Sequence, residues 1–281
     1  MPARRLTRWL PGVVVAVACV VVLKLTGTPL RATALYAVGS VWSVLLPGML
    51  VSRALRSRPR TLVADLSLGF VTGLALQLAA WFVFTGLGAG GFLVLWPIPV
   101  VVLCVAVGPL RRRVWSLAPY ERRLHPATAW ASVAAFAAAM VPLVNTFGAT
   151  GLPPSRWYPD MYWHLGNTHE LMRTVAPLAP QVAGESLTYH WFANAHFAAM
   201  SLTTGIDPIL VVGRLWMPVI AVVTLGMLLA AADTLVGRSW PGVVAAALTF
   251  PAPRSRWRSG SACPGWSRWH SSAPPTSTRR R

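Results

Sequence analysis

The chain has 281 residues, of which 55% are hydrophobic and only 11% are charged. Because a soluble domain carries about 25% charged residues, this composition excludes an ordinary water-soluble protein and indicates a membrane protein. The net charge of +18 does not predict nucleic acid binding, which needs a coherent basic face, because the basic residues are divided between short connections and the last 31 positions, which hold seven of the 25.

Apolar stretches of membrane-spanning length recur along the chain. A helix needs about 20 apolar residues to cross the hydrocarbon layer, and a spanning segment must satisfy its own backbone hydrogen bonds, which favours helices. The sequence therefore predicts an all-α, multi-pass transmembrane helix bundle with one long extracytoplasmic loop. The predicted spans lie at about residues 11–25, 32–51, 62–85, 91–109, 127–147 and 209–236, and a shorter helix is expected at 240–250.

The basic residues between these stretches predict the orientation. Alternate connections carry three, four, five and one basic residues, whereas the other short connections carry two and none. Cytoplasmic loops are enriched in Lys and Arg. We therefore expect a protein of the cytoplasmic membrane with a cytoplasmic N-terminus, an uncleaved first helix and an outward-facing connection after the fifth span.

Composition divides the chain into three regions. Residues 1–126 are expected to form a four-helix transmembrane region, and residues 127–250 a second one that contains the extracytoplasmic loop 148–208. Residues 251–281 contain no Leu, Ile, Val, Met or Phe and no acid, but seven Arg. Our hypothesis is that this tail is translated out of frame, which would make the chain a truncated copy of a longer protein. The alternative is a genuine disordered basic tail.

Polar chemistry is concentrated in the predicted outer loop, which holds four of the seven acidic residues and four of the six histidines. Pro159 suits the first turn of a helix, where its missing N–H costs nothing, and a short helix is predicted from there to about residue 174. Asp160 and His164 are spaced i and i+4, so they share one face of that helix. The simple alternative for Asp160 is a helix-terminus partner of the dipole.

A second short helix is predicted at residues 193–204. It is too short and too polar to span, so we expect it to lie at the membrane interface or to enter the outer leaflet, and to end at Gly205. The aromatic residues around it match the interfacial belt of membrane proteins, where most serve as anchors. They are Trp157, Tyr158, Tyr162, Trp163, Tyr189 and Trp191.

The order of these features resembles the GT-C class of polyprenyl-phosphate-sugar-dependent membrane glycosyltransferases. In that class a spanning helix leads into a large outer loop with an early acidic residue, often a His on a surface helix, and then a polar-aromatic stretch. The matching residues are Tyr158-Pro159-Asp160, His164, Glu170 and Tyr189-His190-Trp191. The resemblance covers roughly residues 127–236.

The resemblance implies transfer of a sugar from a lipid-phosphate donor on the extracytoplasmic side, with the bilayer and that donor as partners. Asp160 would act as general base toward an acceptor hydroxyl, or with His164 as ligand of a divalent metal, Mg²⁺ or Mn²⁺. His164 and His190 are further catalytic candidates. The implied substrate-binding residues, including the basic ones that would stabilise the leaving phosphate, are Arg156, Arg173, Glu170, Tyr189 and Trp191.

Two alternatives stay open. The first is a non-enzymatic multi-pass membrane protein, such as a transporter or an assembly subunit. A transporter is expected to bury ionisable residues at mid-membrane depth, and the helix centres hold little of this kind beyond Gln77. The second alternative is a structural fragment with no activity.

Overall fold

The structure is a computed structural model, and it describes residues 3–56, 61–115, 120, 122–147, 159–179, 182, 184–188 and 190–250. Two predicted substrate-binding residues, Arg156 and Tyr189, and the tail 251–281 lie outside these ranges. Within them the chain is almost entirely helical, with an isolated antiparallel bridge between Leu178 and Ser186. The predicted all-α class is therefore confirmed for the described residues.

The helices follow the predicted apolar stretches in chain order. They are α1 (Ala3–Leu25), α2 (Leu30–Ser40), the π-helical turn η1 (Val41–Leu45), α3 (Leu46–Leu55), α4 (Leu62–Gly86), the 3₁₀ helix η2 (Gly90–Leu95), α5 (Pro97–Ala106), α6 (Gly108–Val114), α7 (Pro126–Phe147), α8 (Pro159–Leu171), α9 (Phe192–Thr204), α10 (Pro208–Leu210), the π-helical turn η3 (Val211–Leu215), α11 (Trp216–Val236) and α12 (Trp240–Thr249).

Three helices in the described part of the chain are long and apolar enough to cross a membrane, namely Leu30–Leu55, Leu62–Gly86 and Pro208–Val236. The first and third of them contain the π-helical turns η1 and η3 without interruption of the helix. The apolar parts of α1, α7 and α12 are shorter than a full span. By length and composition, the described residues thus contain three spans, or four if a bent helix pair counts as one, and the multi-pass interpretation holds with fewer full spans than the six predicted.

The predicted fourth span, residues 91–109, is not one straight helix. Gly90–Ala106 and Gly108–Val114 meet at an angle of 100°, so they form either one broken span or a re-entrant loop. The break falls at Val107, whose backbone is extended (φ −84°, ψ 107°). Pro109 contributes to the break, because a proline lacks the N–H that would bond to the carbonyl oxygen four residues earlier and continue the helix.

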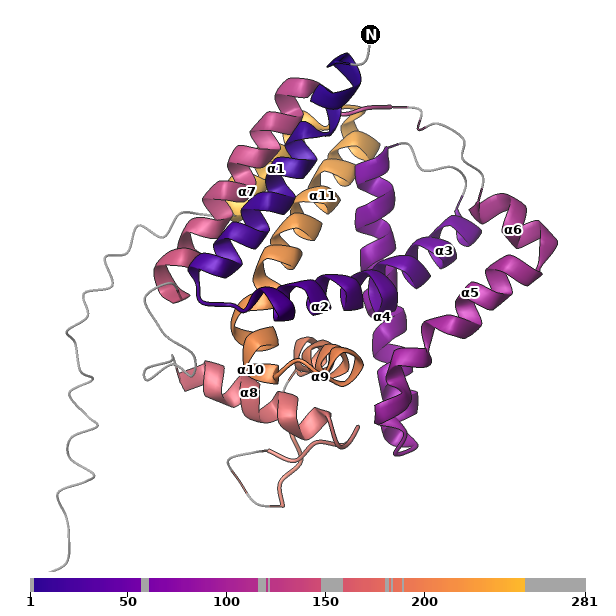
Figure 1. The fold of residues 1–281 in the computed structure, drawn as a ribbon, viewed down its shortest axis with the longest axis vertical. Helices are drawn as coiled ribbons and strands as arrows, with labels where there is room; N and C mark the ends of the chain where they lie inside the picture. Colours follow the sequence, from indigo (N-terminus) through magenta and orange to yellow (C-terminus); the bar gives the residue numbers. More distant parts are fainter. Residues whose placement is uncertain are drawn as a thin grey trace, which may run out of the picture.

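Helices α1, α7 and α11 lie side by side, and α4 follows on the other side of α11 (Figure 1). Phe136 and Met140 of α7 pack against Leu225 and Leu229 of α11 in one apolar core. Helices α2 and α3 run across α4 rather than along it, and a second core lies where α2 and η1 meet α9 and η3. These contacts make α4 and α11 the central elements of the bundle.

Glycines allow α3 and α4 to cross at backbone contact. A Cβ atom on Gly48 would collide with the backbone of Gly69 and Gly73, and one on Gly73 would collide with the carbonyl of Val44. Gly69 and Gly73 are four residues apart on α4, which is the small-xxx-small spacing that lets membrane helices approach closely. This spacing is readable from the sequence once the two helices are known to pack.

Both short helices of the predicted outer loop are present. Helix α8 begins at Pro159 as predicted and ends at Leu171, three residues before the predicted end, and α9 ends at Gly205, whose φ of 69° suits a glycine. Figure 1 shows α9 nearly end-on beside α8, so it runs across α11 rather than along it. Its residues from Asn194 to Ser201 are buried within the helical body.

Candidate functional site

The predicted catalytic pair lies on the N-terminal half of α8. Asp160 is in the first turn and is exposed, and His164 is half-buried one turn later. A carboxylate is stabilised at this end of a helix by the unpaired backbone N–H groups and the helix dipole. The helix thus places an exposed carboxylate and an imidazole on neighbouring turns of one face, as their spacing predicts.

His164 is held by a contact from α9. Its Nδ1 lies 3.2 Å from Oδ1 of Asn194. An amide oxygen only accepts hydrogen bonds, so in this arrangement Nδ1 carries the proton and Nε2 is the basic nitrogen of the neutral ring. The ring also meets the edge of Trp163, with centroids 5.2 Å apart. The orientation of His164 is therefore set by two neighbouring side chains.

Asp160 and His164 would supply two ligands of the predicted metal site, and a substrate phosphate or water would have to supply the others. No group of three or more His, Cys, Asp or Glu side chains occurs among the described residues, and Mg²⁺ and Mn²⁺ prefer octahedral sites rich in oxygen ligands. Asp160 would supply a carboxylate oxygen and His164 its Nε2, because only Nδ1 of the ring contacts Asn194. The reaction proposed below uses the side chains of the chain alone.

Two predicted substrate-binding residues, Glu170 and Arg173, pair with each other. NH2 of Arg173 donates to Oε2 of Glu170 over 2.7 Å, and the Arg173 side chain remains 77% exposed. A surface pair of this kind contributes little to stability. Glu170 lies ten residues beyond Asp160, which is about 15 Å along a helix axis, so the ion pair and the catalytic pair occupy opposite ends of α8.

Trp191 belongs to an aromatic cluster at the ion-pair end of α8. Its ring meets Trp81 edge-on, with centroids 5.7 Å apart, and Trp81 Nε1 donates to the carbonyl oxygen of Leu171 over 2.9 Å. Together with α4 the cluster borders an open, apolar hollow of about 220 Å³. The lining residues are Leu78, Ala79, Trp81, Phe82, Trp191 and Phe192. The setting of Trp191 is apolar, whereas its neighbour His190 is exposed.

A chain of buried hydrogen bonds, to which sequence reasoning assigned no role, runs beneath α8. Nδ1 of His196 lies 2.7 Å from Oε1 of Gln77, and Nε2 of Gln77 donates to Oγ of Ser43 over 3.0 Å. Ser43 in turn donates to the carbonyl oxygen of Gly39 over 2.7 Å. Burial lowers the pKa of His196 to about 3, so its ring is neutral. The chain ties α9 to α4 and to the span that contains η1.

Arg214 is a second residue that sequence reasoning did not identify. It lies in η3, inside the span Pro208–Val236, and its side chain is fully buried. Its Nε donates to the carbonyl oxygen of Thr26 over 3.1 Å and its NH1 to that of Gly213 over 3.2 Å. π-helical turns often mark functional sites, and a buried arginine within a span is costly. The sequence feature that could have identified Arg214 is its position as a lone arginine inside the apolar stretch 209–236.

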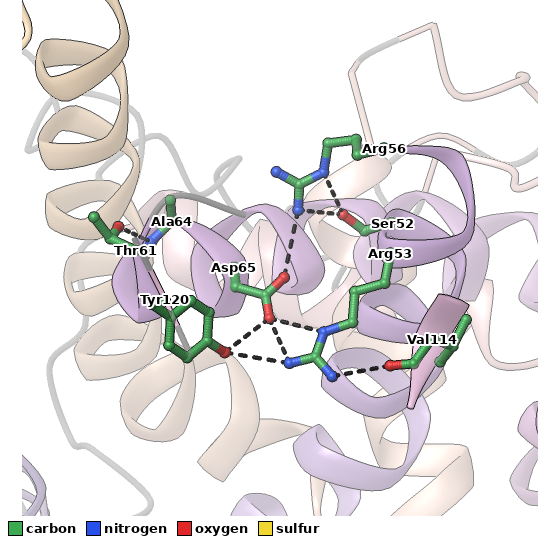
Figure 2. A network of polar contacts seen from close by, with 8 residues as sticks. All are labelled: Ser52, Arg53, Arg56, Thr61, Ala64, Asp65, Val114 and Tyr120. Atoms are coloured by element: carbon green, nitrogen blue, oxygen red, sulfur yellow. Dashed lines mark hydrogen bonds and ion pairs between the residues drawn. The ribbon is translucent and has the colours of Figure 1, made fainter. Parts of the chain in front are cut away.

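Asp65 anchors a polar network at the other predicted face of the membrane (Figure 2). Nε and NH2 of Arg53 donate to Oδ2 of Asp65 over 2.9 and 2.6 Å, and the Tyr120 hydroxyl donates to the same oxygen over 3.1 Å. Arg56 lies 3.5 Å from Oδ1. Asp65 is fully buried, and burial together with the adjacent carboxylate raises the pKa of Tyr120. The network joins α3, α4 and the connection after α6.

The chain matches no known protein family model, no curated protein and no solved structure.

Proposed function

We propose that this chain is an integral membrane glycosyltransferase-like protein that transfers a sugar from a polyprenyl-phosphate donor on the extracytoplasmic side. The observation that carries the proposal is the exposed carboxylate of Asp160 one helical turn from His164, whose Nδ1 is engaged by Asn194. An exposed acid beside an oriented imidazole provides base chemistry at a surface that an acceptor can reach.

Transfer of a sugar requires a base for the acceptor hydroxyl, because an unionised hydroxyl is a weak nucleophile. In the proposed reaction Asp160 takes the proton of that hydroxyl while the oxygen forms a bond to the anomeric carbon of the sugar. The bond between that carbon and the lipid phosphate breaks, and the phosphate leaves with the electron pair. His164, through Nε2, is the second group able to hold the transferred proton.

The leaving phosphate requires positive charge or hydrogen-bond donors. His190 is exposed shortly before α9 and is a candidate donor, whereas Arg173 lies at the opposite end of α8, about 20 Å from Asp160 along the helix axis, and pairs with Glu170. Arg156 and Tyr189 are further candidates by resemblance. The apolar hollow beside Trp191 suits the hydrocarbon chain of a lipid donor, because its walls are aromatic and aliphatic.

The test compares Asp160→Asn with the wild type in membranes supplied with a panel of radiolabelled polyprenyl-phosphate sugars. Transfer of label to cell-envelope material is expected to fall by about 100-fold or more, since a positioned base contributes about 10²–10⁴ in rate. Glu185→Gln is the matched control, because Glu185 is an exposed acid of the same segment outside α8, and it should transfer normally. Undiminished transfer by Asp160→Asn would remove Asp160 from the mechanism, and absence of transfer by the wild type from every donor would contradict glycosyl transfer itself.

A non-enzymatic function, as transporter or assembly subunit, is favoured by a different observation. Arg214 and the hydrogen-bonded pair His196–Gln77 are buried in the helical body, where transporters place polar residues. The variant Asp160→Asn separates the two functions. If the protein is a transporter, its transport activity should be lost on replacement of Arg214 or Gln77 and unchanged in Asp160→Asn.

A further inference from the structure

Buried amide groups without hydrogen-bond partners lie where α8 crosses α9. The side chain of Asn167 is fully buried, and within the part of the chain that the structure describes neither its Oδ1 nor its Nδ2 has a hydrogen-bond partner. Asn194 is 1% exposed, and its Nδ2 is unpaired although its Oδ1 contacts His164. Because the great majority of buried polar groups in proteins are paired, three unpaired atoms at one helix crossing call for a missing partner.

The spacing of residues on α8 places Asn167 over α9. His164, three residues earlier, contacts Asn194, and Leu171, four residues later, packs in one core with Ala195 and Ala198 of α9. Residues spaced by three or four lie on the same face of a helix. Asn167 is therefore bracketed on α8 by two residues that contact α9.

The three unpaired atoms define the chemistry of the partner. Oδ1 of Asn167 needs a hydrogen-bond donor, and the two amide nitrogens need acceptors. An anion can only accept and an ammonium group can only donate, so neither satisfies all three atoms. A hydroxyl group does both, because its proton is donated to the amide oxygen while its oxygen accepts from the nitrogens.

We propose that the α8–α9 crossing is a binding site for a hydroxyl group, hydrogen-bonded by Asn167 and Asn194. The hydroxyl comes either from an internal water, which typically makes about three hydrogen bonds of this kind, or from a hydroxyl-bearing ligand of the membrane. The bound group supports Asn194 and, through Asn194, the orientation of His164. The inference does not depend on glycosyl transfer, because it rests on the unpaired atoms alone.

The test is the sign of the stability change when Asn167 is replaced by leucine, which has the same branched outline but larger, apolar branches. If a hydroxyl occupies the site, Asn167→Leu loses its hydrogen bonds, and the unfolding temperature in membranes should fall by at least about 3 °C. If the amide is unpaired in a dry interface, leucine removes a desolvation cost. An equal or higher unfolding temperature would therefore overturn the proposal. Leu171→Ile on the same face of α8 controls for altered packing.

If Asn167→Leu fails to fold, a pair of isosteric variants tests whether the site holds a hydroxyl group. Asn167→Thr and Asn167→Val have the same shape and differ only in a hydroxyl, so the threonine variant should be the more stable if a partner is present and the less stable if none is. Repeating the comparison on delipidated protein, with and without added total polar lipid, identifies the source. A difference that survives delipidation indicates water, and one that returns only with lipid indicates a membrane ligand.

Discussion

The polar side chains of α8 and α9 differ in what surrounds them, and this divides their roles. Asp160 is exposed, so its carboxylate can meet a substrate. His196 is 3% exposed, packed against Trp216 with ring centroids 4.7 Å apart and ring planes inclined at 52°, and engaged by Gln77. A neutral, enclosed imidazole of this kind serves packing and hydrogen bonding, and in the proposed reaction proton transfer is assigned to residues that remain accessible.

The lowered pKa of His196 predicts a pH dependence of stability. In the folded chain the pKa is about 3, against an ordinary value of 6.5. Between these two values the unfolded chain binds a proton that the folded chain does not, so stability falls as the pH falls, by up to about 1.4 kcal/mol per pH unit. Above the upper value His196 contributes no slope. Denaturant unfolding in detergent between pH 7 and pH 4 measures the effect.

His196→Asn is the informative variant, because asparagine preserves a donor close to the position of Nδ1 and does not titrate. We expect a flatter dependence of unfolding free energy on pH in this variant. His169→Asn is the control, since His169 is exposed on α8 and its replacement should leave the slope unchanged. Equal slopes in the wild type and His196→Asn would show that His196 is not the responsible group.

At the scale of elements, close packing in the bundle depends on glycines and on deviations from regular α-helix. The crossing of α3 on α4 requires Gly48, Gly69 and Gly73, because a Cβ atom at these positions meets a neighbouring helix. The π-helical turns η1 and η3 rotate the helix around Ser43 and Arg214 and turn these polar side chains inward. Both features let polar groups be buried inside an apolar bundle.

Gly73→Ala is expected to destabilise the bundle although alanine favours helix formation. The gain in helix propensity is about 1 kcal/mol, but the added methyl group collides with the backbone of Val44, and overpacking of this kind costs about 1–3 kcal/mol or more where backbone must move. We expect a net loss of roughly 1–2 kcal/mol in unfolding free energy.

Gly12→Ala is the matched control for this prediction. Gly12 also lies inside a helix, α1, but nothing lies within 4 Å of the position that a Cβ atom would take there, so alanine should be neutral or stabilising. Thermal unfolding of both variants in the same detergent makes the comparison. A stabilised Gly73→Ala chain would mean that α3 and α4 do not cross at this contact.

At the scale of the whole molecule, the proposed function depends on which side of the membrane α8 faces. Arginine distribution predicts that α8 and Gly184 lie outside and that α6, with Arg111, Arg112 and Arg113, lies inside. The candidate site is proposed for the outer face. The orientation is therefore a premise of the proposed function.

Cysteine labelling of intact cells measures this orientation. Gly184→Cys, at an exposed position, should react with a membrane-impermeant thiol reagent, whereas Arg112→Cys in α6 should react only after permeabilisation. Native cysteines are replaced by alanine beforehand, since Cys19 is partly exposed. The reversed labelling pattern would place α8 in the cytosol and contradict an extracytoplasmic reaction.

Particular residues show which parts of the fold and of the candidate site could be predicted from the sequence. The start of α8 was predictable because Pro159 acts locally, and the end of α9 because Gly205 adopts a positive φ. The extent of the fourth span was not predictable, because its residues are apolar throughout and hydrophobicity alone does not reveal the bend at Val107. The partners of His164 and His196 were also beyond prediction, since Asn194 and Gln77 come close only after distant helices have packed.

The sequence by itself determined that this is a helical, apolar protein with its acids and histidines gathered in one segment, because hydrophobicity, proline and glycine act on residues close in the chain. Only the tertiary structure decided which of these polar side chains are enclosed and which are accessible. It buried Arg214, Asn167 and His196 and left Asp160 exposed. Burial is set by contacts between residues far apart in sequence, and no local pattern encodes them.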